Sequence, residues 1–367
     1  MRIIIDSYIP FIKGALDSVA EVMYLDYQYI TNQTVCDADV LIVRTRTRCD
    51  EKLLAGSNVK FIASATIGTD HIDKQYCADN GITWVNAPNS NALAVVQYIA
   101  SALSFIVKRA NFKINESTIG IVGVGAVGSK VELLAKSLGM KVLRNDPPRQ
   151  RAEGDAGFVS LDQICEQANI ITFHVPLVTE GQDATYHLAD ANFFEKLKGK
   201  PILINAARGE VIDTKALTRM VRVKKLSHLV IDCWEDEPNI NPELLKLTTI
   251  ATPHIAGYSA EGKVNAAVQV VHAVSKHFDL GKEDWEPWNL PEPMNLSNLK
   301  RMSQEYFYLK TYDIEQDSNR LKENPLNFED IRSRYAFRRE PKAYFKELSD
   351  DFINKIGRFW GDDKYEI

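Results

Sequence analysis

Three glycines in the spacing Gly-x-Gly-x-x-Gly stand between a short apolar run, residues 118–122, and a stretch of helical periodicity, residues 129–138. In a nucleotide-binding turn, the first glycine permits a sharp bend and the second lets the backbone approach a pyrophosphate. The third lets the helix and the strand pack closely, and the helix N-terminus then meets the negative charge. The residues predicted to form this site are Gly123, Gly125, Ala126, Val127 and Gly128.

An acidic residue stands where such a site needs one. A second apolar strand, residues 141–145, ends at Asp146, about 20 residues beyond the second glycine. A carboxylate at this position binds the adenine ribose diol and repels a 2′-phosphate, which favours NAD over NADP. Arg144 and Arg149 lie nearby in the sequence and keep NADP open as an alternative. Strand, glycines, helix and acid together favour dinucleotide binding over a purely structural turn.

Arg208 is the first candidate for contact with a substrate. It ends a buried strand, in the order Ala206-Ala207-Arg208-Gly209. A lone arginine is most often a solvated surface charge. At the mouth of a nucleotide site, however, a planar guanidinium can hold a carboxylate through two parallel hydrogen bonds. We therefore expect Arg208 to bind an anion.

His254 and Glu237 are the candidates for proton transfer. His254 follows another strand, and its imidazole titrates near neutrality, so we expect a general base there. For His71, His174 and His272 a hydrogen-bonded core histidine is the better interpretation. Glu237 lies in the acidic run 232–238, which would normally be a solvated loop, and charge alone does not decide which of its carboxylates acts.

Apolar runs alternate with helical stretches along most of the chain, which is typical of parallel sheets with helices outside. A long apolar helix over 91–109 is expected to connect two lobes, and a helix over 259–280 is expected to return to the first. The remaining predicted helices are 73–80 and 213–223, the second with Asp213 as its N-cap. The remaining predicted strands are 2–5, 40–43, 60–65, 82–85, 170–175, 202–206, 229–232 and 249–251.

Composition excludes several classes of protein. The 367 residues are 45% hydrophobic and 25% charged, with a net charge of −5, so we expect no nucleic-acid partner. Five scattered cysteines without a C-x-x-C pair favour reduced thiols and argue against a zinc site or other metal centre. The apolar tract 92–107 is shorter than a membrane span needs and contains polar residues, so we expect a buried helix, no membrane partner and a cytoplasmic protein.

Several segments together resemble the D-2-hydroxyacid dehydrogenases. They are the glycine motif 120–128, Val43-Arg44-Thr45, residues 65–73, 86–98, Ala207-Arg208, 232–238 and 254–263. The resemblance extends to about residue 340. It implies an α/β fold of two doubly wound parallel-sheet lobes, a Rossmann-type NAD domain and a flavodoxin-like substrate domain, followed by a small C-terminal α+β dimerisation domain. The implied boundaries are 1–92 with 258–283 for substrate, 93–257 for NAD and 284–367 for the homodimer contact.

The C-terminal stretch itself is charged and helical in character, and tyrosine and phenylalanine recur in it. Aromatic residues are enriched at protein interfaces, which favours a dimerisation module. The alternative is a subdomain packed on the main body of its own chain.

The resemblance also implies roles for individual residues. Arg208 would hold the substrate carboxylate, His254 would exchange the proton, and Glu237 would pair with His254. Those implied to contact NAD, besides the glycine turn, are Asp146, Val175, Ala206, Ala207, Arg208, Asp232 and Gly257. Those implied to contact substrate are Thr45, Thr66 and Tyr258, and we add the hypothesis that Arg44, Arg46 or Arg48 binds a phosphate.

The implied reaction is oxidation of a phosphorylated 2-hydroxy acid, with hydride transfer to NAD. The expected substrate is 4-phospho-D-erythronate, on the route to pyridoxal 5′-phosphate. The same catalytic residues would serve a dehydrogenase of 3-phosphoglycerate or of glyoxylate and hydroxypyruvate, so these substrates stay open. A non-catalytic NAD-sensing protein with the same fold is the alternative from another class.

Overall fold

The computed structural model describes residues 1–110, 112–154, 157–287, 289–295 and 303–361. The chain divides into two compact units. Unit 1 contains residues 1–91 and 259–292, and unit 2 contains residues 92–258 and 293–367.

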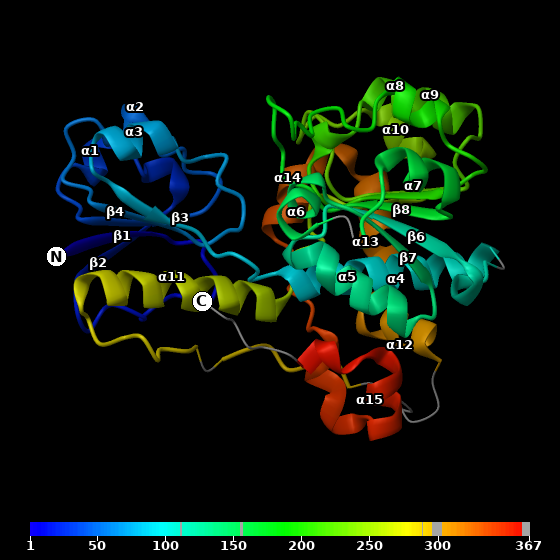
Figure 1. The fold of residues 1–367 in the computed structure, drawn as a ribbon. Coiled ribbons are helices and arrows are strands. Elements are labelled where there is room, and N and C mark those ends of the chain that lie inside the picture. Colours follow the sequence, from blue (N-terminus) through cyan, green and yellow to red (C-terminus); the bar gives the residue numbers. More distant parts are fainter. Residues whose placement is uncertain (111, 155–156, 288, 296–302, 362–367) are drawn as a thin grey trace. The chain divides into compact units, whose positions relative to one another are not determined.

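Unit 1 is built on a five-stranded parallel sheet with the strand order β2-β1-β3-β4-β5, which is the flavodoxin-like order. Helices α1–α3 cover one face of this sheet and α11 covers the other (Figure 1). The strands are β1 (Arg2–Asp6), β2 (Glu21–Leu25), β3 (Val40–Val43), β4 (Phe61–Ser64) and β5 (Thr83–Val85). The helices are α1 (Asn32–Val35), α2 (Glu51–Leu54), α3 (Lys74–Asp79) and α11 (Ala260–Phe278).

Unit 2 is built on a six-stranded parallel sheet with the order β11-β10-β9-β8-β6-β7. Because β6 pairs with β7 on one side and β8 on the other, the strand order reverses at β6, where such sheets bind ligands. The strands are β6 (Thr118–Val122), β7 (Lys141–Asn145), β8 (Ile170–Phe173), β9 (Ile202–Asn205), β10 (His228–Ile231) and β11 (Ile250–Ala251).

Helices cover both faces of the larger sheet (Figure 1). Alternate residues of the strands point to opposite faces, so Ile119 and Ile121 pack with α4 and α5, whereas Val122 and Phe173 belong to the cluster that includes α7–α10. These helices are α4 (Ala92–Ala110), α5 (Ala126–Ser137), α6 (Pro147–Glu153), α7 (Leu161–Gln167), α8 (Ala191–Glu195), α9 (Thr214–Arg222) and α10 (Pro242–Leu247). The prediction of two doubly wound parallel sheets is confirmed.

The described part of the C-terminal segment is helical, whereas an α+β arrangement was expected. Its helices are α12 (Gln304–Thr311), α13 (Ile314–Glu323), α14 (Phe328–Ser333) and α15 (Asp350–Ile356). Phe307, Tyr308 and Trp360 are fully buried and share a core with α4, so these aromatic side chains pack within their own chain. The helical character expected from the sequence of this stretch is confirmed, and the described residues add no strand to it.

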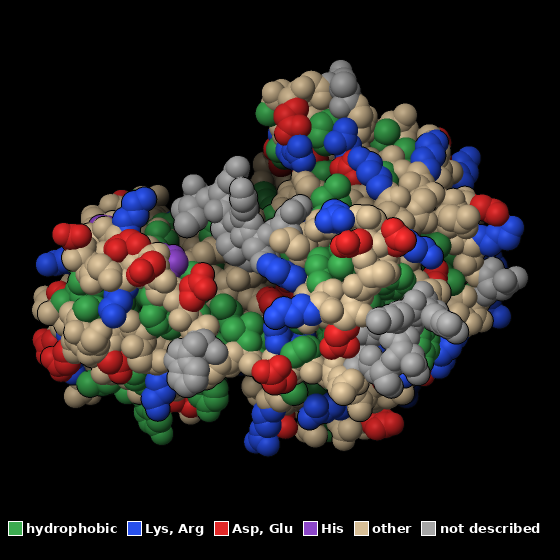
Figure 2. Space-filling view, turned by 90° about the horizontal axis from the view of Figure 1, so that it is seen from below, with side chains coloured by type: hydrophobic (Ala, Val, Ile, Leu, Met, Phe, Trp, Pro, Cys, Tyr) green, Lys and Arg blue, Asp and Glu red, His purple; other side chains and the backbone are tan. Residues whose placement is uncertain are grey.

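Helix α4 meets the length and hydropathy of a membrane span, and it is the one helix in the described ranges that does. Residues 92–106 of this helix are all buried inside unit 2, as expected for a core helix. On the face of the molecule shown in Figure 2, basic and acidic side chains are interspersed.

Two local features differ from the sequence analysis. Strand β2 was not predicted at all. Helix α5 begins at Ala126, immediately after the second glycine of the motif, rather than at Ser129, which brings its N-terminus to the turn itself.

Candidate active site

The three glycines of the motif occupy three different environments. Gly123 has a φ of +87°, and a Cβ there would lie 2.7 Å from the backbone of His174. A Cβ on Gly128 would lie 2.0 Å from the carbonyl oxygen of Gly123, so only glycine permits this close approach of helix and strand. A Cβ on Gly125 would meet no heavy atom within 4 Å. The backbone therefore opens onto space at the glycine predicted to face a pyrophosphate.

The N-terminus of α5 fits an anionic group at this place. Gly125 is its N-cap and has no side chain to accept from the first turn. An approaching phosphate can therefore take these N–H groups, with the helix dipole in its favour. The residues present fit the pyrophosphate of a dinucleotide.

Asp146 lies at the end of β7 and points toward the glycine turn. Its Oδ2 accepts a hydrogen bond from the backbone N–H of Val124 at 2.8 Å, and its Oδ1 accepts from that of Arg149 at 3.1 Å. Arg149 pairs with Glu153 at 2.6 Å, and Arg144 donates to the carbonyl of Gly157. Both arginines that left NADP open thus have partners within the protein.

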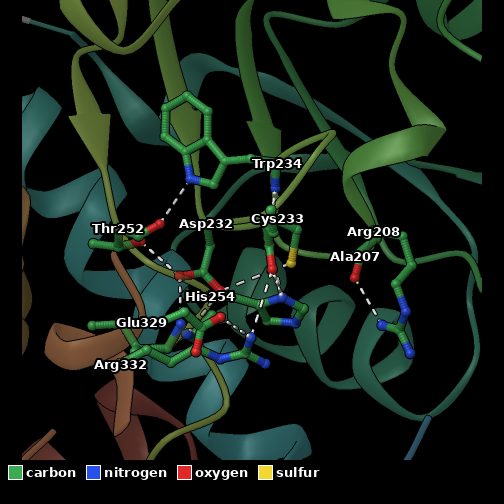
Figure 3. A network of polar contacts seen from close by, with 12 residues as sticks. Ala207, Arg208, Asp232, Cys233, Trp234, Thr252, His254, Glu329 and Arg332 are labelled. Atoms are coloured by element: carbon green, nitrogen blue, oxygen red, sulfur yellow. Dashed lines mark hydrogen bonds and ion pairs between the residues drawn. The ribbon is translucent and has the colours of Figure 1, made fainter. Parts of the chain in front are cut away.

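The turn after β9 is joined to the turn after β10. The side-chain amide of Asn205 donates to the carbonyl of Arg208 at 2.9 Å and to that of Cys233 at 3.2 Å. A Cβ on Gly209 would lie 1.9 Å from the backbone of Trp234, so the two turns are in direct contact. These contacts place Ala206, Ala207 and Arg208 beside the turn that carries Glu237. The guanidinium of Arg208 donates to the carbonyl of Ala207 (Figure 3).

His254 and Glu237 form a hydrogen-bonded pair, as the family resemblance implied. The Nδ1 atom of His254 lies 2.9 Å from Oε2 and 3.2 Å from Oε1 of Glu237. Glu237 is itself held, because its Oε1 accepts from the backbone N–H of Trp234 at 2.8 Å. With Nδ1 bound to the carboxylate, Nε2 is the imidazole nitrogen left for a substrate. His254 has a φ of +58°, in the left-handed region that non-glycine residues seldom adopt.

The pKa values of this pair diverge. Burial by itself lowers the pKa of His254, but the neighbouring Cys233 and the Glu237 carboxylate raise it well above its ordinary value. Burial by itself raises the pKa of Glu237, but His254 and Arg332 hold it below its usual range. The pair can therefore store a proton on the imidazole while the carboxylate stays ionised.

Asp232 fixes the backbone on which His254 lies. Its carboxylate is buried and accepts from the backbone N–H groups of Ile255 at 2.8 Å and Ala256 at 2.9 Å. It also accepts from the hydroxyl of Thr252 at 2.7 Å. Burial raises the pKa of Asp232, although these hydrogen bonds oppose the shift. The thiol of Cys233 lies 4.0 Å from Oδ2, so the side chain predicted to contact NAD has four protein partners in the described part of the chain.

Cys233 lies beside the same pair. One ligand atom each from Cys233, Glu237 and His254 lies within 4.8 Å of the other two, a grouping that could hold a metal ion. Glu237 and His254 are already hydrogen-bonded to each other, however, and the cysteine is buried. The expectation of no metal stays a prediction.

Two arginines of the C-terminal segment complete the site, and the sequence analysis missed both. Nη1 of Arg332 lies 3.7 Å from Oε2 of Glu237. Arg338 is buried and donates to the carbonyls of Ile255 at 3.1 Å and Tyr258 at 3.2 Å, and its Nε donates to Gln97 on α4. It also bonds the carbonyls of Ala94 and Ala256. The signal that could have pointed to both is the group of four arginines between residues 332 and 339 in a chain with a net negative charge.

The remaining predicted substrate residues belong to unit 1, except Tyr258. Arg44 pairs with the buried carboxylate of Asp6 at 3.0 Å. Thr45 is exposed. The hydroxyl of Thr66 lies 2.7 Å from that of Ser64, which lies 3.0 Å from Nε2 of His71. His71 is thus hydrogen-bonded and buried, as its interpretation as a core histidine requires, and burial lowers its pKa to about 4.

A family model and the curated relatives of this chain agree on one family. Residues 104–256 match the model of the D-isomer specific 2-hydroxyacid dehydrogenase, NAD binding domain. An erythronate-4-phosphate dehydrogenase of Bacteroides thetaiotaomicron is 50% identical over 94% of this chain and 98% of its own length. The enzyme of the same name from Porphyromonas gingivalis is 43% identical, over 94% of this chain and 95% of its own length.

Solved structures show the same fold. The D-lactate dehydrogenase of Aquifex aeolicus, complexed with NAD and lactic acid, matches with a TM-score of 0.64 and 27% identity, over 77% of this chain and 96% of its own. The NAD-bound 3-phosphoglycerate dehydrogenase of Entamoeba histolytica matches with a TM-score of 0.65 and 25% identity, over 79% of this chain and 99% of its own. About a fifth of the present chain thus lies outside each of these two matches.

Proposed function

This chain belongs to the erythronate-4-phosphate dehydrogenases, within the D-isomer specific 2-hydroxyacid dehydrogenase family, and we propose that it oxidises 4-phospho-D-erythronate. The products would be 2-oxo-3-hydroxy-4-phosphobutanoate, NADH and a proton, on the route to pyridoxal 5′-phosphate. The resemblance inferred from the sequence is confirmed at the level of the family, and the chain is an NAD-dependent dehydrogenase.

The observation that carries the proposal is the hydrogen-bonded pair of His254 and Glu237, 2.9 Å apart, in a unit that also holds the glycine turn. Loss of a hydride from C2 is favoured when the hydroxyl proton leaves at the same time, which requires a base with a pKa near the working pH. Nε2 of His254 can accept that proton. Glu237 fixes the ring and stabilises the imidazolium that forms, because its carboxylate lies against Nδ1.

Arg208 supports a carboxylate-bearing substrate. Its guanidinium follows β9, one strand away from the β10 turn that holds Glu237, and the planar fork of donors matches a carboxylate. We propose that Arg208 holds C1 so that the C2 hydroxyl meets His254, a positioning effect. Tyr258, four residues beyond His254, would contact the same substrate.

Bound NAD supplies the hydride acceptor. Within the chain, the turn from Gly123 to Gly128 would hold the pyrophosphate and Asp146 the adenine ribose. The other residues proposed to line this site are Val175, Ala206, Ala207, Asp232 and Gly257.

Unit 1 is proposed to supply further substrate contacts through Thr45, Thr66 and Arg44. Arg44 cannot be tested by removal alone, since Arg44→Ala would also leave the buried Asp6 carboxylate without its ion pair. The double variant Asp6→Asn, Arg44→Ala removes both charges. If Arg44 binds the phosphate, KM rises far more for the phosphorylated substrate than for an unphosphorylated hydroxy acid in that background too. Equal rises for both substrates would reject the phosphate role.

We further propose that the protein is a cytoplasmic homodimer that uses the C-terminal residues 284–367. The proposal rests on the family resemblance, because the aromatic side chains described above pack within one chain. Sedimentation of the full chain would measure the state, and a monomer at micromolar concentration would contradict it.

The decisive experiment is turnover of the purified protein with NAD, followed by nicotinamide absorbance. We expect 4-phospho-D-erythronate to be oxidised with a kcat/KM at least tenfold above that for 3-phosphoglycerate or glycerate. Faster oxidation of 3-phosphoglycerate would reassign the substrate. NAD binding without turnover of any of the three would support a sensing protein instead.

A further inference from the structure

Arg332 reaches the active site from the C-terminal segment. It lies on α14, which is anchored by Phe328 and Ile331, both buried in the same hydrophobic cluster as Ile231 and Trp234 of the NAD-binding domain. Because those two residues flank the β10 turn, the anchoring brings the Arg332 guanidinium beside that turn. The position of Arg332 is therefore fixed by packing of α14 and not by its charge alone.

The guanidinium has three partners. Its Nη1 atom lies 3.7 Å from Oε2 of Glu237 and 3.8 Å from Oε1 of Glu329, and its Nε donates to the hydroxyl of Tyr258 at 3.3 Å. The Arg332 side chain is 18% exposed, so water screens these contacts only weakly. In Figure 3, Arg332 and Arg208 lie on opposite sides of His254.

We propose that Arg332 is a positioning residue for proton transfer, acting on the Glu237–His254 pair through its charge and on Tyr258 through its Nε–H. The proposal rests on the function proposed above, in which His254 accepts the substrate proton.

The electrostatic part follows from the sign of the charge. A guanidinium 3.7 Å from the Glu237 carboxylate favours its ionised form and disfavours a second positive charge on the adjacent imidazole. Without Arg332, the proton would be held more tightly by the pair. Arg332 therefore keeps His254 available as a base at a lower pH than Glu237 alone would allow. The other titratable groups that face His254 or Arg332 are Asp232, Cys233, Tyr258 and Glu329.

The hydrogen-bonding part concerns Tyr258. Its hydroxyl oxygen accepts from Arg332, so its own proton is directed away from the guanidinium. A hydroxyl oriented in this way can donate to an oxygen of the substrate. Arg332 would then set the direction in which the Tyr258 hydroxyl donates to the substrate, and it would also set the proton affinity of His254.

The test compares Arg332→Gln with Arg334→Gln. Arg334 lies at the end of the same helix, is 77% exposed on its side chain and pairs with Asp330, so it provides a matched loss of one positive charge. The imidazole titration of His254 is followed by NMR on histidine-labelled protein, with the signal assigned from its absence in His254→Asn. We expect Arg332→Gln to raise the pKa of His254 by about one unit, and Arg334→Gln to leave it unchanged.

Turnover gives the second readout. The acid limb of kcat/KM for oxidation should move to higher pH by the same amount in Arg332→Gln and stay in place in Arg332→Lys, which keeps the charge. The lysine variant should instead raise KM, because it lacks the fixed Nε–H that orients Tyr258. If Arg332→Gln does not fold, a raised acid limb in Arg332→Lys alone overturns the proposal.

An unchanged or lowered His254 pKa in folded Arg332→Gln overturns the proposal, and so does an equal shift in Arg334→Gln. A uniform loss of activity at every pH, without movement of the limb, would show a merely structural role. The NMR titration needs no substrate, so it separates this inference from the proposed function. If the wild type does not oxidise 4-phospho-D-erythronate, the function fails whatever the titration shows.

Discussion

His174 and His254 both lie just beyond the carboxyl end of a strand of the same parallel sheet, the first after β8 and the second after β11. Their proton affinities are opposite. Burial lowers the pKa of His174 to about 3, and its Nε2 lies 2.9 Å from the neutral hydroxyl of Thr172. The pKa of His254 is raised well above its ordinary value, because Cys233 and the Glu237 carboxylate together outweigh the effect of burial.

The difference teaches that the end of a strand brings a side chain to the ligand side of the sheet but does not make it a base. The partner of the imidazole decides that, and the partner comes from another turn. Glu237 follows β10, and it meets His254 only because β10 and β11 are neighbours in the sheet. Four predictions test or refine this comparison.

The largest effect is expected at His254, the proposed base. His254→Asn should lower kcat by about 10³-fold, since general-base catalysis is lost while the side-chain volume is largely kept. His174→Asn should lower kcat by less than about tenfold. Steady-state kinetics with 4-phospho-D-erythronate measure both. Comparable losses in the two variants would break the distinction between them.

Glu237→Gln should make His254 resemble His174. Without the carboxylate, one of the two groups that raise the pKa of His254 is lost, so this pKa falls and the acid limb of kcat/KM for oxidation moves to lower pH. The maximal rate should fall by about 10²-fold, because the imidazolium that forms is no longer stabilised. The pH profile of kcat/KM measures both changes. An acid limb that stays in place would mean that Glu237 does not set the proton affinity of His254.

Stability should depend on pH in opposite ways at the two histidines. The folded pKa of His174 is depressed, so its contribution is complete above pH 6.5 and is lost on acidification toward pH 3. When the pH falls from 7 to 5, the titration of His174 should lower the free energy of unfolding of the wild type by about 2 kcal/mol. His174→Asn should not show this decrease. The folded pKa of His254 is raised, so its contribution to the stability of the folded protein is complete below pH 6.5. This contribution disappears as the pH rises through the folded pKa.

Urea unfolding of the wild type, His174→Asn and His254→Asn, at pH 5, 7 and 9, measures how the free energy of unfolding changes with pH. If His174→Asn loses as much stability as the wild type on acidification, another group is responsible for the loss. The buried His71, with its pKa of about 4, is the first to examine.

The smallest effect is expected at the cofactor end of the sheet. There the carboxylate of Asp146 would act on the ligand and not on an imidazole. Asp146→Asn keeps one side-chain oxygen, which can cap α6 through the Arg149 N–H or accept from the Val124 N–H but not both, and it removes the charge that repels a 2′-phosphate. The ratio of kcat/KM for NAD to that for NADP should fall about tenfold. An unchanged ratio would show that Asp146 only hydrogen-bonds the glycine turn and does not select between the two cofactors.

The parts of the site that the sequence predicted are those fixed by local geometry. The glycine turn, Asp146 and Arg208 each stand at the end of an apolar strand, and the carboxyl ends of parallel strands necessarily share one edge. The pairing of Glu237 with His254 came from the family resemblance, because charge alone did not distinguish the carboxylates of the 232–238 run. The structure distinguishes them, since Glu235 pairs with His187 instead.

What the sequence did not predict depends on packing between distant segments. Arg332 and Arg338 reach the site only after α14 and the residues beyond it have docked on the sheet. Strand β2 is an edge strand, partly exposed along its length, and so lacks the continuous apolar run that marks the central strands. The ion pair of Arg44 with Asp6 joins residues at the ends of neighbouring strands, which a sequence motif cannot reveal.

The contact between Gly209 and the backbone of Trp234 has a consequence for how such a site can change. It joins the turn that carries Arg208 to the turn that carries Glu237 through backbone atoms on both sides, so no side chain there could be shortened to separate them. A lineage that needs a longer or shorter substrate cannot widen this span by point substitution there. It must enlarge the site elsewhere, or rebuild both turns together.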